Sequence, residues 1–387
     1  MCNDHMKVAI ALDSFKGSLS SYEAGRAVSE GIAAVDRDAK TVICPLADGG
    51  EGTVSAIASS MGGTLCKVKV CGPLGDGVDA EYCVIPEERT AIIEMAAAAG
   101  ITLIGAEQRN PLLTTTYGVG ELIAHAITKN DCRKFIIGIG GSATNDGGVG
   151  MLQALGFSFL DANGNEIPRG AQGLSVLSEI KCDEALSALS ECEFYIACDV
   201  TNPLCGEQGC SAVFGPQKGA TPEMIKDMDR WLERYARLSE RATGGSFAGT
   251  PGAGAAGGLG FAFISYLRGR LESGIGLVMR TTHLEDKIKD ADIVVTGEGR
   301  LDGQTSMGKA PIGVAKLAKK YGKPVIAFSG CVTEDAKLCN QEGIDAFFPI
   351  LRTVCTLEEA MDSDNAYQNL KNTVEQAFRL INATSVV

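Results

Sequence analysis

The amino-acid sequence predicts an α/β protein with two domains, one of them assembled from both ends of the chain. Near the N-terminus an apolar strand (residues 7–13), a polar loop and a helical segment follow one another, and a second such strand begins at residue 41. The same order returns after residue 290. Alternating strands and helices favour a parallel sheet with polar loops at the carboxyl ends of its strands. We therefore expect one discontinuous α/β domain of residues 1–65 and 290–387.

The middle of the chain, residues 66–289, is expected to form a second, mixed α/β domain inserted into the first. Residues 65–104 contain short β-like runs separated by Pro and Gly, which are typical of antiparallel strands. Helical periodicity follows at residues 118–129 and, with charge pairs, at residues 222–241. A length of 387 residues agrees with this division, because single cores rarely grow so large.

Composition restricts the class of partner and the compartment. A net charge of −13 disfavours nucleic acid and anionic membranes as partners, although an anionic substrate could bind a locally basic site. The 14 cysteines contain no C-x-x-C pair, and we expect reduced thiols in a cytoplasmic protein without a signal peptide or membrane span. Only three histidines are present, which disfavours a histidine base. The sequence leaves the oligomeric state open.

The most informative segment is a Gly-rich strand exit at residues 138–148. The apolar run 135–139 reads as a buried strand, and residues 140–148 then contain no side chain larger than Asn or Asp. Such small residues let backbone N–H groups approach a phosphate or carboxylate, whereas a simple turn would need only one or two glycines. The candidate ligand-binding residues of this loop are Gly140, Gly141, Ser142, Asn145 and Asp146.

Acidic residues end three predicted strands, at Asp13, Asp48 and Asp199. Catalytic bases and Mg²⁺ ligands occupy this position in α/β enzymes, although an N-cap or Asx-turn role would place Asp there too. Cations also occur in Gly-rich loops, where they could neutralise a phosphate in an otherwise acidic protein. These cations are Lys16, Lys218 and Arg300.

Two glycine motifs match known nucleotide-binding patterns only in part. Residues 303–309 nearly form a P-loop, but position 310 is Ala where a Mg²⁺-binding hydroxyl is required, so Lys309 could contact phosphate or simply face solvent. Residues 252–257 match G-x-G-x-x-G without a preceding strand, which indicates a close-packing or phosphate-lining loop around Gly254. Together these features favour phosphoryl transfer with a Mg²⁺-nucleotide. The alternatives are a kinase of another small hydroxy acid on the same fold, a nicotinamide oxidoreductase and a non-catalytic binding protein for small acids.

At these motifs the chain resembles the bacterial glycerate kinases of the glyoxylate and sugar-acid pathways. The matching segments follow the family's order over nearly the whole chain: DSFKGSLSS (13–21), PLADGGEGT (45–53), GIGGSATNDGG (138–148), FGPQKGA (214–220), PGAGAAGGLG (251–260) and TGEGRLDGQTSMGKAPIGVA (296–315). The resemblance implies ATP-dependent phosphorylation of D-glycerate with Mg²⁺, usually to 2-phosphoglycerate, although related enzymes make 3-phosphoglycerate. It also implies a flavodoxin-like, Rossmann-type domain from both chain ends and an active site in the cleft between the domains.

Residue roles follow from these motifs as hypotheses. Asp199 or Asp13 would position or deprotonate the glycerate hydroxyl, and Asp48 would lie near the metal. Lys16 and Arg300 would hold anionic groups. The Gly-rich loop and Lys309 would face the phosphates, with further substrate or phosphate contacts from Ser14, Lys218, Gly254 and Glu298.

Overall fold

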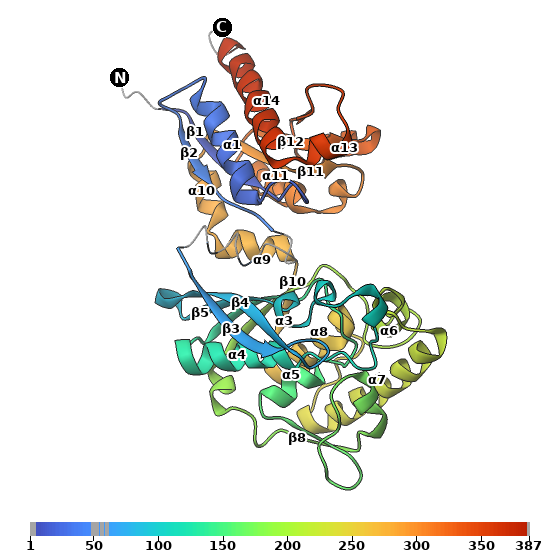
Figure 1. Ribbon diagram of the computed structural model, residues 1–387. Coiled ribbons are helices and arrows are strands. Elements are labelled where there is room, and N and C mark those ends of the chain that lie inside the picture. Colours follow the sequence, from blue (N-terminus) through green and yellow to red (C-terminus); the bar gives the residue numbers. More distant parts are fainter. Residues whose placement is uncertain (1–4, 48–53, 55–57, 59–61, 385–387) are drawn as a thin grey trace. The chain divides into compact units, whose positions relative to one another are not determined.

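The computed structural model describes residues 5–47, 54, 58 and 62–384, and these form two compact units. Unit 1 contains both ends of the chain, up to residue 47 and again from Ile275, and unit 2 contains residues 62–274 (Figure 1). The prediction of an α/β protein with one domain built from both chain ends and one inserted domain is confirmed.

The return of the chain to unit 1 falls at Ile275, ahead of the sequence-based boundary at residue 290. Two helices account for this position, α9 (Gly274–Thr281) and α10 (Leu284–Asp290). The second of them packs on the first strand of unit 1 and on the helix that follows residue 309. Its buried Leu284 and Ile288 therefore belong to the core of unit 1.

Unit 1 is built on a sheet of five parallel strands in the order β13-β12-β11-β1-β2. The strands are β1 (Lys7–Leu12), β2 (Lys40–Ile43), β11 (Ile293–Leu301), β12 (Val325–Val332) and β13 (Ala346–Pro349). Numbered along the chain, the order is 2-1-3-4-5, which is that of the flavodoxin-like fold. The strand order reverses between β1 and β11, and this switch point is where such sheets bind ligands, outside the carboxyl ends of the strands.

Helices cover both faces of this sheet. They are α1 (Ser21–Ala33), α9, α10, α11 (Ala310–Lys320), α12 (Leu338–Gln341), α13 (Leu357–Met361) and α14 (Ser363–Thr384). The chain moves from β1 to β2 in one direction and from β11 to β12 in the other, so right-handed crossovers place α1 and α11 on opposite faces. On the first face α14 packs beside α1 over Val8, Ile10 and Leu12, which alternate along β1 (Figure 1).

Unit 2 contains a mixed sheet in the order β10-β9-β6-β5-β4-β3. Its strands are β3 (Thr64–Cys71), β4 (Gly77–Ile85), β5 (Thr90–Glu94), β6 (Lys134–Gly138), β9 (Glu193–Ala197) and β10 (Arg270–Glu272). The pairs β3/β4 and β4/β5 are antiparallel, as the short runs in residues 65–104 predict. The other pairs are parallel, so β5, β6, β9 and β10 all end at the same edge.

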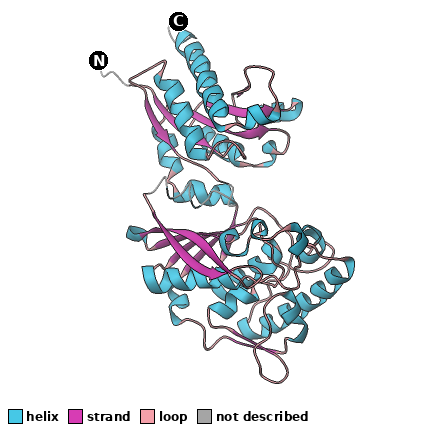
Figure 2. Cartoon of the chain, viewed as in Figure 1, coloured by secondary structure: helices cyan, strands magenta, loops and turns pink. Residues whose placement is uncertain are grey.

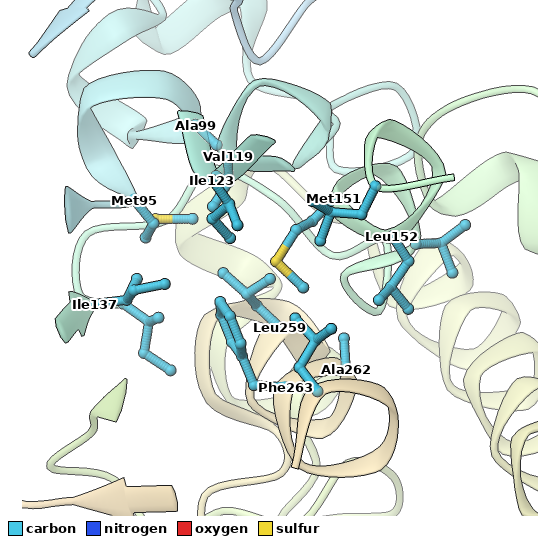
Figure 3. Packing of buried hydrophobic residues seen from close by; sticks show 14 of the residues in the cluster. Met95, Ala99, Val119, Ile123, Ile137, Met151, Leu152, Leu259, Ala262 and Phe263 are labelled. Atoms are coloured by element: carbon cyan, nitrogen blue, oxygen red, sulfur yellow. The ribbon is translucent and has the colours of Figure 1, made fainter. Parts of the chain in front are cut away.

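The core of unit 2 lies between this sheet and its helices (Figure 2). The helices are α3 (Ala96–Ala99), α4 (Tyr117–Asn130), α5 (Val149–Ala154), α6 (Cys210–Phe214), α7 (Pro222–Thr243) and α8 (Ala255–Leu267), with a small hairpin of β7 (Ser158–Leu160) and β8 (Glu179–Lys181). Figure 3 shows Ile123 of α4, Met151 of α5 and Phe263 of α8 gathered near Ile137 of β6. This packing fixes α5, and with it the loop that joins β6 to α5.

Two further observations concern the predictions from composition. Within the described ranges, no helix combines the length and the apolar character needed to cross a bilayer. The cysteines that the structure describes are all free thiols.

Candidate functional site

The first group of candidate residues lies at the carboxyl ends of β1 and β11, the switch point of the sheet in unit 1. Leu12 at the end of β1 pairs with Gly297 of β11, and β11 continues to Leu301 beyond that point. The prolonged part of β11 therefore carries Glu298 and Arg300 past the end of its neighbour. From the sequence alone this strand is predicted to end at Thr296, where its apolar run stops.

Two carboxylates meet in this group at the hydroxyl of Thr305. The hydroxyl lies 2.7 Å from Glu298 Oε1 and 3.4 Å from Asp302 Oδ1. Burial raises the pKa of the Glu298 carboxyl, while the hydrogen bond from Thr305 and the positive charge of Lys309 act in the opposite direction. A carboxylate that is partly desolvated and flanked by charges is a frequent feature of functional sites.

Three cations surround these carboxylates, and all three are exposed: Lys16, Arg300 and Lys309. Arg300 Nε lies 3.4 Å from Asp302 Oδ2, and Lys309 Nζ lies 4.0 Å from Asp302 Oδ1. Asp302 is half-buried, but both cations are exposed and both pairs are long, so an incoming phosphate could compete for either cation. The group can therefore accept a strongly anionic ligand.

The segment between β11 and α11 is not a P-loop of the Walker type. The N–H groups of Gln304 and Thr305 donate to Asp302 Oδ1, and those of Gly308 and Lys309 donate to the Thr305 carbonyl. A Walker loop keeps such N–H groups available for phosphates. This agrees with the doubt raised by the alanine that follows Lys309, and the ammonium of Lys309 remains the group suited to phosphate.

Asp13 and Ser14 follow β1 directly. Asp13 is buried, with 7% of its surface exposed, and its Oδ1 accepts the Ser14 N–H at 2.7 Å. The Asp13 N–H donates to the Gly297 carbonyl at 2.9 Å, which ties the exits of β1 and β11 together. The half-buried Ser14 leads into the turn that carries Lys16. Asp48, the candidate metal ligand, lies outside the described residues.

The second group lies in unit 2 and centres on the Gly-rich loop between β6 and α5. Gly140 and Gly141 are exposed at its tip, and their N–H groups have no hydrogen-bond partner among the residues that the structure describes. Gly141 has a φ of +72°, which residues with a side chain rarely adopt. Unpaired N–H groups at an exposed turn can bind a phosphate or carboxylate, as the sequence predicts for this loop.

The polar side chains of this loop are buried, and two of them stabilise its fold. Asp146 is fully buried and accepts hydrogen bonds from Thr116 N–H (2.8 Å), Thr116 Oγ1 (2.9 Å) and the N–H groups of Gly148 and Gly150 (3.1 and 3.3 Å). Burial raises the pKa of Asp146, and these donors oppose that change. Asn145 is also fully buried and donates to Ser211 Oγ at 2.9 Å. Direct ligand contact by Asn145 or Asp146 therefore stays a prediction without structural support.

Lys218 approaches the same loop from the interior. Only 2% of its surface is exposed, and its Nζ donates to Ser142 Oγ at 2.7 Å and to the Thr144 carbonyl at 2.6 Å. Burial lowers the pKa of Lys218 to about 8, although Cys210 and Asp146 act in the opposite direction. Ser142 is itself 7% exposed, so both side chains of this contact are largely enclosed.

The second Gly-rich segment packs against the first through its backbone. A Cβ on Gly257 would lie 2.0 Å from the Thr144 carbonyl oxygen, and one on Gly258 would lie 2.8 Å from the Cα of Gly147. The N–H of Gly147 donates to the Gly257 carbonyl at 2.9 Å. Gly254 is buried, and a Cβ there would lie 2.2 Å from the Pro203 carbonyl oxygen. Of the two interpretations left open for residues 252–257, the structure shows close packing.

Asp199 follows β9 at the same edge of the unit 2 sheet. It is exposed, and its Oδ1 accepts the N–H of Gly274 at 3.0 Å. Glu94, which ends β5 at this edge, was missed by the sequence analysis although it also closes an apolar strand. Its Oε1 accepts the Val54 N–H at 2.8 Å. Asp302 and Thr305 were missed as well, and the Asp-Gly pair after β11 was the available signal.

Comparison with known proteins shows matches along almost the whole chain. A model of the glycerate kinase family matches residues 8–382. A glycerate kinase of Haemophilus influenzae is 47% identical over 97% of this chain and 99% of its own length. A glycerate 2-kinase of Escherichia coli K12 is 48% identical over 94% and 95% of the two chains. A crystal structure assigned as glycerate kinase 2 of Salmonella typhimurium LT2 superimposes with a TM-score of 0.92 at 47% identity, covering 99% of this chain and 100% of that one.

The fold and these matches define a kinase of the two-domain α/β class. Within that class, the chain belongs to the glycerate kinase family. The resemblance drawn from the sequence motifs is confirmed. The matches give no support to a nicotinamide oxidoreductase or to a non-catalytic binding protein.

Proposed function

We propose that the protein transfers the γ-phosphoryl group of ATP to D-glycerate and forms 2-phosphoglycerate. The observation that carries the proposal is the group of exposed cations and partly buried carboxylates at the switch point of unit 1. Phosphoryl transfer depends mainly on positioning and on charge stabilisation, which such a group can supply. The full-length similarity to an E. coli protein named glycerate 2-kinase supports the acceptor and the product.

In this proposal the charged groups of unit 1 bind phosphate. Lys16, Arg300 and Lys309 neutralise phosphate oxygens, with Ser14 as a further hydrogen-bond donor. Arg300 can present two parallel N–H groups to one phosphate, whereas the two lysines act as point charges. Each is exposed, so a ligand reaches it without rearrangement of the core.

Magnesium suits the oxygen donors at the switch point. The described residues hold no cluster of three or more His, Cys, Asp or Glu side chains, but Mg²⁺ in kinases commonly takes one or two carboxylates and completes its shell with water and phosphate. Glu298 and Asp302, which meet at Thr305, would hold it, with Asp48 as a further candidate. Bound there, the ion would offset negative charge on the phosphates.

A carboxylate is proposed to accept the proton of the glycerate hydroxyl. Asp199 is our first candidate because its carboxylate is exposed and is oriented by the Gly274 N–H. Asp13 is the second, since it also ends a strand but is almost enclosed. The exposed N–H groups of Gly140 and Gly141 would bind an anionic group of one substrate, either phosphate or carboxylate.

A coupled assay tests the reaction. We expect ADP release from ATP that depends on D-glycerate and Mg²⁺, and no accompanying change in nicotinamide absorbance. No ADP release with any hydroxy acid offered would refute the kinase reaction. Activity only with another hydroxy acid would correct the acceptor and leave the rest of the proposal in place.

Phosphorus NMR of the product decides which hydroxyl is attacked. We expect the signal and coupling of 2-phosphoglycerate. A product identical to 3-phosphoglycerate would place the protein with the related enzymes that phosphorylate the other hydroxyl.

The free thiols of the described cysteines support a reducing compartment, and we propose that the protein acts in the cytoplasm on small molecules. The net charge of −13 argues against nucleic acid as a partner.

A further inference from the structure

Lys218 combines three properties that are rarely found together. It carries a charge, and only 2% of its surface is exposed. The two groups that accept hydrogen bonds from its ammonium, Ser142 Oγ and the Thr144 carbonyl, both belong to the Gly-rich loop. Burying a charge costs free energy. If Lys218 served only to fill space, an apolar side chain could replace it without loss of stability. The ammonium must therefore contribute something that an apolar side chain could not.

The chain around Lys218 shows what that contribution is. Lys218 closes a short 3-10 turn, Pro216–Lys218, that follows α6. Within α6, Ser211 receives the hydrogen bond from the Asn145 side chain. The segment 210–219 thus contacts the Gly-rich loop at two points, through Ser211 and through Lys218.

Close contacts at Gly219 restrict the backbone of the turn that carries Lys218. Gly219 has φ of +90°, and a Cβ there would lie 2.3 Å from the Arg109 carbonyl oxygen. The N–H of Gly219 donates to the Pro216 carbonyl at 3.0 Å. The backbone that carries Lys218 is therefore fixed by close contacts at Gly219.

The tip of the loop, ahead of the residues that Lys218 contacts, is exposed. The exposed Gly140 and Gly141 precede Ser142 directly, and their N–H groups are available to a ligand. Glycines hold no conformation by themselves, because they lose more backbone freedom on folding than other residues. A fixed contact at Ser142 and Thr144 restricts the tip from its carboxyl side.

We propose that Lys218 is a positioning residue that holds the Gly-rich loop from the interior, so that the N–H groups of Gly140 and Gly141 are presented to a phosphate or carboxylate of the substrate. This role differs from the direct phosphate contact that its sequence motif indicates. It rests on the proposed kinase function for its effect on catalysis, but the holding of the loop can be measured without any substrate.

The test compares Lys218→Met with Lys226→Met, a matched control on the exposed side of α7. Hydrogen exchange followed by mass spectrometry measures the opening of the peptide that covers residues 139–146. We expect exchange in this peptide to be about tenfold faster or more in K218M, and unchanged within about twofold in K226M. Peptides of α14 in unit 1 should exchange at the wild-type rate in both variants.

Kinetics then separate positioning from direct contact. For K218M we expect kcat/KM to fall about tenfold or more together with faster loop exchange, since misplacing a binding group by a small distance is costly. Loop exchange at the wild-type rate with a raised KM for ATP or D-glycerate would overturn the proposal in favour of direct contact. Wild-type values in both measurements would also overturn it.

Ser142→Ala keeps the proposal testable if K218M does not fold. This substitution removes one acceptor and leaves the Thr144 carbonyl, so we expect a smaller increase in loop exchange, about twofold to fivefold. Where both single variants fold, the double variant K218M/S142A should exchange little faster than K218M, because the two changes break the same contact. Additive effects on exchange would show that Lys218 and Ser142 act separately. If no kinase activity is found at all, the exchange measurements still decide whether Lys218 holds the loop.

Discussion

In unit 1 the cationic side chains at and beyond the end of β11 face solvent, whereas in unit 2 the polar side chains in and against the loop after β6 are buried. Arg300 and Lys309 are exposed, while Asn145, Asp146 and Lys218 are almost completely enclosed. Both segments are rich in glycine and polar residues, and the sequence predicts a phosphate-binding role for both. In the proposed function these segments would bind anions in two ways: unit 1 with charged side chains, and unit 2 with backbone N–H groups held by charges from within.

The largest effect is expected on the stability of unit 2. Asp146→Ala removes the acceptor of buried donors on Thr115, Thr116, Gly148 and Gly150, and we expect a loss of about 3–5 kcal/mol in the free energy of unfolding, as for other broken buried charge networks. Denaturant titration monitored by the single Trp231, which packs against the unit 2 core, measures the loss. Asp227→Ala, which breaks an exposed pair with Arg230, is the control and should change stability by less than about 1 kcal/mol. A similar stability for both variants would contradict the role of Asp146 as a buried acceptor that stabilises the Gly-rich loop.

The buried ammonium of Lys218 predicts a stability change with pH. Its pKa is about 8 in the fold and near the ordinary lysine value when unfolded, so the unfolded chain binds more protons between these pH values. The free energy of unfolding of wild type relative to K218M should therefore rise from pH 8 to about 10.5, by on the order of 3 kcal/mol at most. Parallel denaturant titrations of the two proteins check this. A constant difference would mean that the pKa of Lys218 is not lowered in the fold, and a falling difference would mean that it is raised.

Replacing Asp199 tests whether an exposed side chain of unit 2 affects activity but not stability, as we expect for the exposed cations of unit 1. Asp199→Asn keeps an acceptor for the Gly274 N–H but removes the base, so kcat should fall by about 100-fold or more with little change in KM. The denaturation midpoint should stay at the wild-type value because the side chain is exposed. Wild-type turnover would remove Asp199 from the mechanism and leave Asp13 as the candidate.

Arg300 gives the smallest effect and the clearest contrast with Asp146. Arg300→Met removes an exposed cation whose ion pair with Asp302 is long, so stability should change by less than about 0.5 kcal/mol. The kcat/KM for ATP should fall about tenfold, the usual result of losing one hydrogen bond to a charged group. Arg379→Met on α14 serves as the control for both measurements. A large loss of stability in R300M would show that unit 1 also uses its charges to hold its fold.

Sequence reasoning predicted the fold well because the fold depends on regular patterns. Apolar strands followed by polar loops and helices indicated parallel sheets, and the return of this pattern after residue 290 indicated a domain shared by both chain ends. The order of the strands, which fixes the switch point between β1 and β11, was not derivable from those patterns. It depends on contacts between segments far apart along the chain.

Residue roles were harder to predict for a specific physical reason. A Gly-rich loop identifies a place where a ligand could approach, but local sequence does not show toward which side of the loop a side chain points. The sequence predicts ligand contacts for Asn145, Asp146 and Lys218; the structure places all three side chains in the interior, and the contacts themselves stay predictions. Asp302 was overlooked because it lies one residue beyond a strand whose end was placed too early.

The position of β1 inside the sheet, with a neighbouring strand on each side, has a consequence for how the chain is made. β1 pairs on one side with β2, which is synthesised soon after it, and on the other side with β11, whose last residue is Leu301. At synthesis rates of about 5–20 residues per second, the ribosome needs on the order of 15–60 s to add the chain between them. During that time the inserted unit can fold by itself, whereas the N-terminal strand exposes one unpaired edge. Completion of the kinase must therefore await its last hundred residues, and binding of nascent chains by chaperones should be strongest for this early segment.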